Sequence, residues 1–307
     1  MSYQLQRTYG IDSTYWYTPE NAMPPMVGQL FMKSDPDEVT QAFLDQSASI
    51  SGNYFWQTIR NVSVMVLGLI YTKTDINGFT GFGNMFLFSE NQMAKFLGID
   101  RQTWSSNGKK ILDLGAGNGD ITAHLKPLFD TVYATELSKS MRRRLTSKGY
   151  KLLNAVDWAT TDEKFDLITA FNLLDRHYSP RKLLRDLWKK SHESNCYVVL
   201  SLVLPISHYV EFNPIGTGTW PDAFLNVRGR TYTEHLETLI VNEIIPANFE
   251  VIRWTRLPYL CEGDMHNSAY YLSDAVFLLK PLPSKETITP PSDGMNREQY
   301  ANTHQEL

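Results

Sequence analysis

The sequence predicts an α/β fold with a mostly parallel seven-stranded sheet, which ends in an antiparallel strand pair, and a helical cap at the N-terminus. After Asn107-Gly108, short apolar runs alternate with segments of helical length, as is typical of parallel strands joined by crossover helices. A glycine-rich turn follows the first of these runs. Two long runs rich in β-branched and aromatic residues close the pattern and predict the antiparallel pair.

Residues 1–106 are predicted to form the helical cap, because their apolar residues recur three and four positions apart. The ranges with this spacing are Asp35–Phe43, Phe55–Tyr71 and Ser89–Leu97. Ser89 followed by Gln92 is typical of a capping box at a helix N-terminus. The most apolar run, Val62–Tyr71, is about half the ~20 residues that a membrane-spanning helix needs, so we expect a buried helix and no membrane span.

Residues 107–282 are predicted to form the sheet and the helices that cover it. Strands are expected at Lys110–Leu114, Thr131–Thr135, Tyr150–Val156, Phe165–Phe171, Tyr197–Leu204, Phe249–Arg256 and Tyr270–Leu279. Helices are expected at Met141–Lys148, Arg181–Lys190 and Tyr232–Ile244. Residues 283–307 are polar and contain several prolines, so they have little to bury and are predicted to be disordered.

Composition and charge limit the class of protein. The chain has 307 residues, of which 42% are hydrophobic, so it can bury a substantial core. Its formal net charge of -4 gives no global basic field that would attract nucleic acid. Cys196 and Cys261 show no metal-ligand spacing, so we expect reduced core residues and no metal site. The polar N-terminus lacks an export signal, which predicts an intracellular protein, most simply a cytoplasmic one. Association with the endoplasmic reticulum or mitochondrion, and the oligomeric state, stay open.

A cofactor site is predicted where the first strand ends. The run Lys110–Asp120 passes from an apolar strand into a loop that includes Gly115 and Gly117, whose missing side chains let a ligand approach the main chain closely. A dinucleotide-binding loop would have a third glycine where this chain has Asp120, and Asp113 directly precedes the loop. Two carboxylates repel a pyrophosphate but suit the ammonium and sulfonium groups of S-adenosylmethionine. The loop therefore predicts a Rossmann-like methyltransferase.

Two further strand ends supply predicted contacts to the same cofactor. Glu136 follows the second strand, about 20 residues past the glycine loop, where an acidic side chain commonly receives ribose hydroxyls. Asp157 and Trp158 follow the third strand, where a carboxylate can accept from the adenine amino group and an aromatic ring can stack on the base or line its pocket. Asp157 fits a helix N-cap equally well, so both roles stay open.

The turn after the fourth strand is predicted to hold the methyl acceptor. Asn172 and Asp175 are three residues apart in a tight strand-to-helix turn, so both polar groups can face one pocket. Taken alone, Asp175 also fits a helix cap and Arg176 a surface ion pair. The segment from Pro205 to Thr231 is predicted either to form a lip over this groove or to be an ordinary surface loop.

Five runs of sequence together resemble the DREV family of methyltransferases. They are Asp113–Gly119, Tyr133–Ser138, Asn172–Arg176, Leu202–Pro205 and Arg256–Met265, and the resemblance covers roughly Gly78 to Pro281. It implies S-adenosylmethionine as the cofactor. The members that this chain most resembles methylate the pros nitrogen of histidines in His-x-His motifs of other proteins. The resemblance also implies an acceptor pocket formed by Asn172, Asp175, Arg176, Tyr259 and Tyr271.

The expected reaction is an in-line displacement in which a neutral imidazole attacks an activated methyl group. A histidine with a reference pKa of ~6.5 is mostly neutral at pH 7. We expect Asp175 to accept the N–H of the acceptor ring, and Asn172 to orient the same ring and also to contact the cofactor. Two rival functions stay open, namely a small-molecule methyltransferase of the same fold and a non-catalytic adaptor that keeps the fold as a scaffold.

Overall fold

The computed structural model describes residues 6–7, 13–19, 23–53, 83–210, 212–213, 218–264 and 267–284. The strands are β1 (Gln6–Arg7), β2 (Met85–Phe86), β3 (Lys110–Leu114), β4 (Thr131–Thr135), β5 (Lys151–Leu153), β6 (Leu167–Phe171), β7 (Tyr197–Val203), β8 (Phe249–Glu262) and β9 (Ala269–Pro281). The α-helices are α1 (Pro25–Gly28), α2 (Glu38–Ser51), α5 (Glu90–Leu97), α6 (Asp120–Ala123), α7 (Lys139–Ser147), α8 (Pro180–Ser194) and α9 (Tyr232–Leu239). Three short 3-10 helices are η1 (Ser13–Tyr17), η2 (Lys126–Leu128) and η3 (Trp158–Thr160), and a π-helix, η4 (Ile240–Ile244), continues α9.

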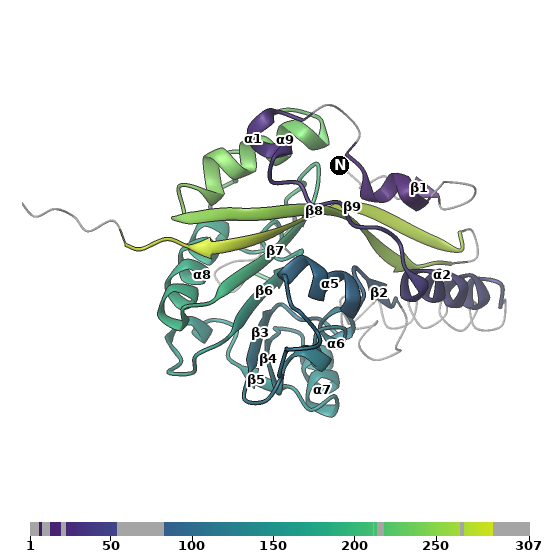
Figure 1. Ribbon diagram of the computed structural model, residues 1–307, viewed down its shortest axis with the longest axis horizontal. Coiled ribbons are helices and arrows are strands. Elements are labelled where there is room, and N and C mark those ends of the chain that lie inside the picture. Colours follow the sequence, from purple (N-terminus) through teal and green to yellow (C-terminus); the bar gives the residue numbers. More distant parts are fainter. Residues whose placement is uncertain are drawn as a thin grey trace, which may run out of the picture.

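The described strands form one sheet in the order β2-β8-β9-β7-β6-β3-β4-β5, with β1 paired to β9 beside this path. Figure 1 shows β3, β4 and β5 in the lower half of the view and β8 and β9 above them. Strands β3 to β7 pair in parallel, whereas β9 is antiparallel to β7 and to β8. The chain moves from β3 outward to β5 and then returns to β6 on the other side of β3. In such sheets, ligands bind at the carboxyl ends of the strands where the order reverses, here between β3 and β6.

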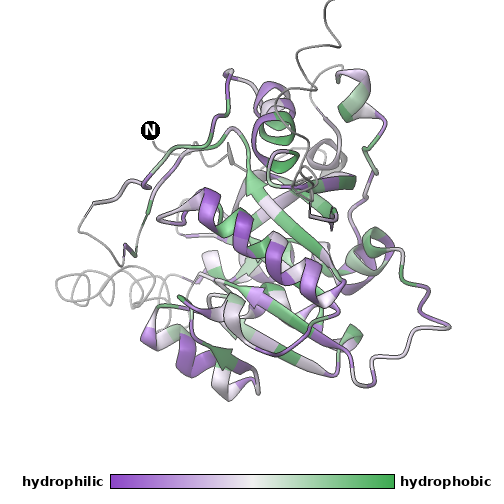
Figure 2. Cartoon of the chain, turned by 90° about the vertical axis from the view of Figure 1, so that its left-hand side faces the viewer, coloured by the Kyte–Doolittle hydropathy of each residue, from purple (hydrophilic) through white to green (hydrophobic). Residues whose placement is uncertain are grey.

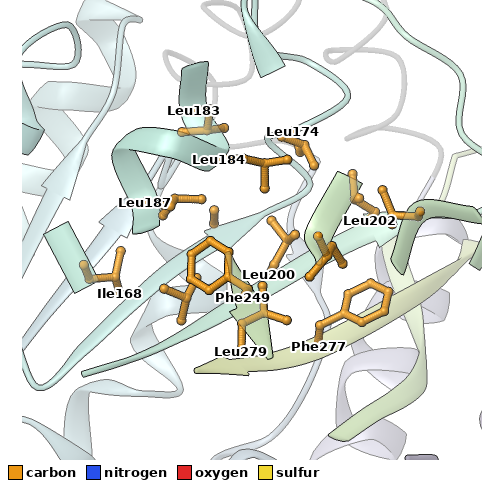
Figure 3. Close-up of a cluster of buried hydrophobic side chains, with 14 of the residues drawn as sticks. Ile168, Leu174, Leu183, Leu184, Leu187, Leu200, Leu202, Phe249, Phe277 and Leu279 are labelled. Carbon is orange, nitrogen blue, oxygen red and sulfur yellow. The ribbon is translucent and has the colours of Figure 1, made fainter. Parts of the chain in front are cut away.

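Alternate residues of the central strands pack against opposite faces of the sheet. Leu112 and Leu114 belong to the hydrophobic cluster that includes α8 and α9, whereas Ile111 belongs to the cluster that includes α5 and α7. Figure 2 shows the strands as mainly hydrophobic and the helices as mixed in hydropathy, as expected when each helix turns one side to the sheet. In Figure 3 the α8 leucines Leu183, Leu184 and Leu187 lie over Ile168, Leu200 and Leu279 of the strands.

Local signals fix the ends of the covering helices. The predicted capping box at α5 is confirmed, because Ser89 Oγ accepts from the Gln92 backbone N–H at 3.1 Å and the Gln92 side chain accepts from the Ser89 backbone N–H at 2.8 Å. Helix α8 begins with Pro180, whose missing N–H costs nothing in the first turn. It ends at Ser194 and is capped by Asn195, which is in the left-handed conformation with φ 52°.

The N-terminal region contributes two strands as well as helices. β1 pairs with β9 and β2 pairs with β8, so the part of the sheet that the structure describes has nine strands where the sequence predicts seven. Trp254 of β8 also donates its indole N–H to the Val27 carbonyl at 2.8 Å. The sheet and its side chains thus cross the predicted boundary between residues 106 and 107. Two-residue strands carry no detectable period, which is why the sequence did not reveal them.

The predicted strands are confirmed to different extents. β3 and β4 have the predicted bounds, and β8 and β9 are longer than predicted. β5 covers only Lys151–Leu153 of the predicted Tyr150–Val156. The predicted helix at Phe55–Tyr71 and the tail from residue 285 lie outside the described residues. Among the residues that are described, no helix is both long and apolar enough to cross a membrane.

Candidate cofactor and acceptor site

The loop between β3 and α6 contains glycines in the left-handed region of backbone space. Gly115 (φ 67°) donates its N–H to Thr135 Oγ1 at 3.1 Å, and Gly117 (φ 56°) donates to Glu136 Oε2 at 3.0 Å. A Cβ atom at Gly117 would meet nothing within 4 Å, whereas at Gly115 it would lie 2.9 Å from Leu173 Cδ1. The open space at Gly117 fits a ligand that lies against the main chain. Gly115 lets the loop contact the turn after β6.

Glu136 lies beside this loop at the carboxyl end of β4. The half-buried carboxylate accepts from the Ser138 backbone N–H at 2.8 Å through Oε1 and from Gly117 through Oε2. These main-chain donors hold the carboxylate at the rim of the loop, where a ribose would be received. The position fits the predicted ribose contact, which stays a prediction.

Asp113 lies beneath the loop and not at its open rim. The residue is 2% exposed and accepts from the hydroxyls of Thr122 on α6 and Thr169 on β6, the latter at 2.7 Å. Burial raises the pKa of Asp113 to about 6, and the two hydroxyl bonds oppose this rise. Asp113 therefore joins β3 to α6 and β6, and its direct contact with the cofactor stays a prediction.

Asp120, the other carboxylate of the loop, is paired. Its side chain forms an ion pair with Lys148 at 2.5 Å and also accepts from Asn118 Nδ2 at 2.5 Å. The negative charge that disfavours a pyrophosphate is thus partly neutralised at Asp120. The electrostatic preference for a cationic cofactor consequently depends more on Glu136.

Asp157 and Trp158, the predicted adenine contacts, differ in exposure. Asp157 is exposed and precedes η3, but its side chain makes no capping hydrogen bond to that helix. Trp158 is 5% exposed and packs in the hydrophobic cluster that includes α8. The carboxylate of Asp157 thus remains available to a ligand, and the adenine contact stays a prediction for both residues.

Asn172 starts the turn after β6 in the left-handed conformation, with φ 50°, which asparagine adopts more readily than most residues. Its side chain bridges two strands. Nδ2 donates to Asp274 Oδ2 at 2.7 Å, and Oδ1 accepts from the Val203 backbone N–H at 3.0 Å. The backbone N–H of Asn172 also donates to the Ser201 carbonyl at 3.0 Å. These bonds fix the start of the turn that carries Asp175.

Asp175, Arg176 and Tyr259 are close together on the acceptor side. Asp175 is 1% exposed, and Arg176 Nε lies 3.2 Å from its Oδ2. Burial raises the pKa of Tyr259 well above its usual value, the charges of Asp274 and Asp175 add to the rise, and the charge of Arg176 opposes it. These groups therefore share one electrostatic environment, and their role as an acceptor pocket stays a prediction.

The two tyrosines predicted for this pocket have different surroundings. The Tyr259 hydroxyl donates to Met85 Sδ at 2.6 Å, from a strand position beside the carboxylates. Tyr271 is 4% exposed, and its ring centroid lies 5.1 Å from that of Trp16. Tyr271 thus packs against the N-terminal segment, and its contact with an acceptor stays a prediction.

Asp274 is the polar residue of this region that the sequence reasoning missed. It is fully buried, which raises its pKa to about 8; hydrogen bonds from Asn172 and Ser201 oppose the rise, and the charge of Asp175 adds to it. The available signal was Ser273-Asp274, a polar pair within an otherwise apolar strand. Buried aspartates are rare without a partner or a function.

The segment after β7 contacts the acceptor turn. The Tyr209 backbone N–H donates to the Asp175 carbonyl at 3.2 Å, and the Asp222 backbone N–H donates to the Tyr178 carbonyl at 2.8 Å. Exposed aromatic side chains gather on this segment: Tyr209 is 48%, Trp220 62% and Phe224 55% exposed. The segment therefore lies against the turn, and its role as a lip stays a prediction; residues 211 and 214–217 are outside the described part of the chain.

The glycine loop, the acidic end of β4 and the reversal of strand order define a Rossmann-like methyltransferase, with the loop and the Asn172–Arg176 turn meeting at one edge of the sheet. The sequence profile described as "DREV methyltransferase" matches residues 16–281. The chain belongs to this family, and its cofactor is S-adenosylmethionine.

Several solved structures are distantly similar to this chain. A putative RNA methyltransferase from Pyrococcus horikoshii is 13% identical with a TM-score of 0.41, over 62% of this chain and 80% of that one. An S-adenosylmethionine-dependent methyltransferase from Clostridium acetobutylicum is 14% identical with a TM-score of 0.38, over 74% and 99%. Magnesium protoporphyrin IX methyltransferase from Synechocystis, with bound SAH, is 16% identical with a TM-score of 0.38, over 76% and 99%. Such distant likenesses carry no information on the acceptor.

Proposed function

We propose that this methyltransferase transfers the methyl group of S-adenosylmethionine to the pros nitrogen of histidines in His-x-His motifs of other proteins. The observation that carries the proposal is the contact between the cofactor loop and the acceptor turn. Leu173 lies so close to Gly115 that a Cβ atom there would be 2.9 Å from Leu173 Cδ1. The turn that bears Asn172 and Asp175 is therefore next to the loop that would hold the cofactor.

The cofactor side of the site consists of main-chain groups and one well-placed carboxylate. Gly117 leaves open space at the loop, and Glu136 lies at its rim, bound to the Gly117 N–H. We assign Gly115 and Gly117 to the methionine part, Glu136 to the ribose and the exposed Asp157 to the adenine amino group. Bound S-adenosylmethionine supplies a methyl group activated by a positively charged sulfur.

The acceptor side orients a neutral imidazole. Asp175 accepts the N–H of the tele nitrogen, which leaves the lone pair on the pros nitrogen as the nucleophile. The new N–C bond forms as the S–C bond breaks, and the electron pair of the broken bond stays on sulfur. Asp175 stabilises the imidazolium that results, until its proton leaves to solvent. Arg176 holds the Asp175 carboxylate in place from the partly exposed side.

A polypeptide acceptor suits the surface beside this turn. Tyr209, Trp220 and Phe224 expose aromatic side chains on the segment that contacts Asp175 and Tyr178. Aromatic residues are enriched at protein interfaces, where they bury large areas for little loss of side-chain entropy. A small metabolite enclosed in the acceptor pocket would leave this surface without a role.

The test is methylation of a synthetic His-x-His peptide by purified protein with isotopically labelled cofactor, followed by mass spectrometry. Fragments that contain the methylated histidine are compared with pros- and tele-methylhistidine standards. We expect label on the pros nitrogen, and none when the accepting histidine of the peptide is replaced by alanine. Label that enters only a metabolite fraction would identify a small-molecule methyltransferase. Absence of cofactor binding by calorimetry would identify a non-catalytic adaptor.

A further inference from the structure

We propose that Asp274 of β9 is a positioning residue, which as a neutral carboxylic acid fixes the side chain of Asn172 and thereby the acceptor turn. The expected effect on turnover rests on the proposed function, whereas the expected effect on the Asn172 side chain does not. Asp274 lies on the far side of β7 from the turn after β6, opposite Val203 in the pairing of β7 with β9. It is therefore placed to hold the turn without reaching the acceptor itself.

The orientation of the Asn172 amide follows from its partners. The Val203 backbone N–H can only donate, so the amide oxygen of Asn172 must face it, at 3.0 Å. The amide nitrogen must then face Asp274, whose Oδ2 accepts at 2.7 Å. Since the Asn172 backbone N–H is also bound to the Ser201 carbonyl, the residue is fixed at both its main chain and its side chain.

The surroundings of Asp274 favour the neutral form. The side chain is fully buried, with hydrogen bonds from Asn172 and Ser201, and its Oδ1 has no hydrogen-bond partner among the described residues. A buried carboxylate oxygen without a partner is costly, and much more so when the group is ionised. A protonated carboxyl can still accept from Asn172 through its carbonyl oxygen, so neutrality does not sacrifice the bond to Asn172.

The charged and titratable groups around Asp274 add to this preference. Asp175 and Arg176 lie on the turn after β6, and Tyr259 and Cys261 lie on β8. The charge of Arg176 lowers the pKa of Tyr259, whereas that of Asp274 raises the pKa of both Tyr259 and Cys261. Burial raises the pKa of Asp274 to about 8 against the opposing hydrogen bonds from Asn172 and Ser201, and the charge of Asp175 adds to the rise. At pH 7 the group is therefore mostly protonated. Above pH 8 a second negative charge forms beside Asp175 and pushes the turn away from β9.

Two substitutions separate positioning from general stability. Asp274→Asn stays neutral at every pH and keeps an oxygen for Asn172, whereas Asp274→Leu has a similar volume and accepts nothing. Ser273→Ala is the matched control, because Ser273 is the preceding residue of β9 and its hydroxyl accepts from Arg256 instead. Each protein is assayed for kcat and KM on the His-x-His peptide from about pH 6 to 10, and for cofactor affinity by calorimetry.

We expect wild type and Ser273→Ala to lose turnover above about pH 8, and Asp274→Asn to show no such loss. At pH 7, Asp274→Asn should stay within about threefold of the wild-type kcat, and Asp274→Leu should fall by about tenfold or more with unchanged cofactor affinity. The proposal is overturned if Asp274→Asn keeps the alkaline loss. It is equally overturned if Asp274→Leu turns over like wild type, or loses cofactor affinity as strongly as turnover.

A nuclear magnetic resonance experiment tests the effect of Asp274 on the Asn172 side chain without any acceptor. The side-chain amide signals of Asn172, assigned by their loss in Asn172→Ala, are followed across the same pH range. We expect them to shift with a midpoint near pH 8 in wild type and not in Asp274→Asn. Signals that do not move in wild type would disprove the role of Asp274. If they move as expected while no histidine peptide is methylated, the proposed function fails and the positioning role stands.

Discussion

The backbone N–H of Gly117 donates to Glu136 Oε2 at 3.0 Å, so the glycine loop after β3 is joined directly to the acidic end of β4. The left-handed backbone of Gly117 aims this N–H at the carboxylate, and the space where a side chain would be is open. Together with the bonds from the Gly115 and Ala116 N–H groups to Thr135, this bond holds the two places where the cofactor would bind close together. A bound ribose would share the Glu136 carboxylate with the loop.

Replacing Glu136 by alanine is expected to weaken cofactor binding by about tenfold or more, which corresponds to about 1.4 kcal/mol. The loss arises because both the ribose acceptor and the anchor of the Gly117 N–H are removed. Isothermal titration calorimetry with S-adenosylmethionine measures the effect. Glu163→Ala is the control, since Glu163 pairs with Lys110 at the opposite end of β3. Equal affinities for the two variants would remove Glu136 from the site.

Gly117→Ala and Gly108→Ala should cost about the same stability but differ in cofactor binding. Both glycines have positive φ, 56° and 72°, and a Cβ at either position meets nothing within 4 Å. Each substitution should therefore destabilise the fold by roughly 1 kcal/mol through backbone strain alone, as measured by urea unfolding. Only the methyl group at 117 intrudes on the cofactor. If Gly117→Ala binds S-adenosylmethionine like Gly108→Ala, the ligand does not lie against this loop.

Asp175→Ala is expected to lower kcat on the His-x-His peptide by about 100-fold and to change cofactor affinity little. The reason is that Asp175 fixes the tautomer of the acceptor ring and stabilises the imidazolium, which forms only during transfer. Asp186→Ala is the control, because Asp186 forms an ion pair with Lys182 on the surface of α8. Turnover that is the same in both variants would assign Asp175 to the fold alone.

The stability of the fold should depend on the protonation of Asp113. Burial raises the pKa of Asp113 to about 6, above the ~3.9 expected in the unfolded chain. The folded state therefore binds the proton more tightly, so this contribution to the free energy of unfolding is full below about pH 4 and is lost as the pH rises to about 6. Asp113→Asn should lack this part of the pH dependence in urea unfolding. An identical slope in both proteins would contradict the shift.

Both cysteines are expected to resist thiol reagents in the folded protein. Burial raises the pKa of Cys196 and that of Cys261 to about 12, so almost no thiolate is present at pH 8. Titration with a chromogenic disulfide reagent should show no fast reaction under native conditions and two reacting thiols in guanidinium. Fast native labelling of either cysteine would show that its environment opens in solution.

The elements that sequence reasoning located correctly are those with strong local signals. β3 and β4 combine an apolar run with a glycine turn or an acidic end, and α5 has a capping box within four residues. The roles that it missed depend on pairing between distant segments. Asp274 shows its importance only when β9 is paired with β7 and faces Asn172, 102 residues away in sequence. Likewise, the glycine-rich motif after β3 does not reveal that the Asp113 carboxylate accepts from the hydroxyls of Thr122 and Thr169.

β1 covers a part of β9 that lies beyond the end of β7. β7 pairs with β9 only as far as Asp274, and β1 pairs with the next part of β9, at Tyr270 and Tyr271. Deleting β1 would remove the strand that pairs with this part of β9, and exposed strand edges recruit other chains. A protein that lacks its first dozen residues should consequently elute as a self-associated species in size-exclusion chromatography.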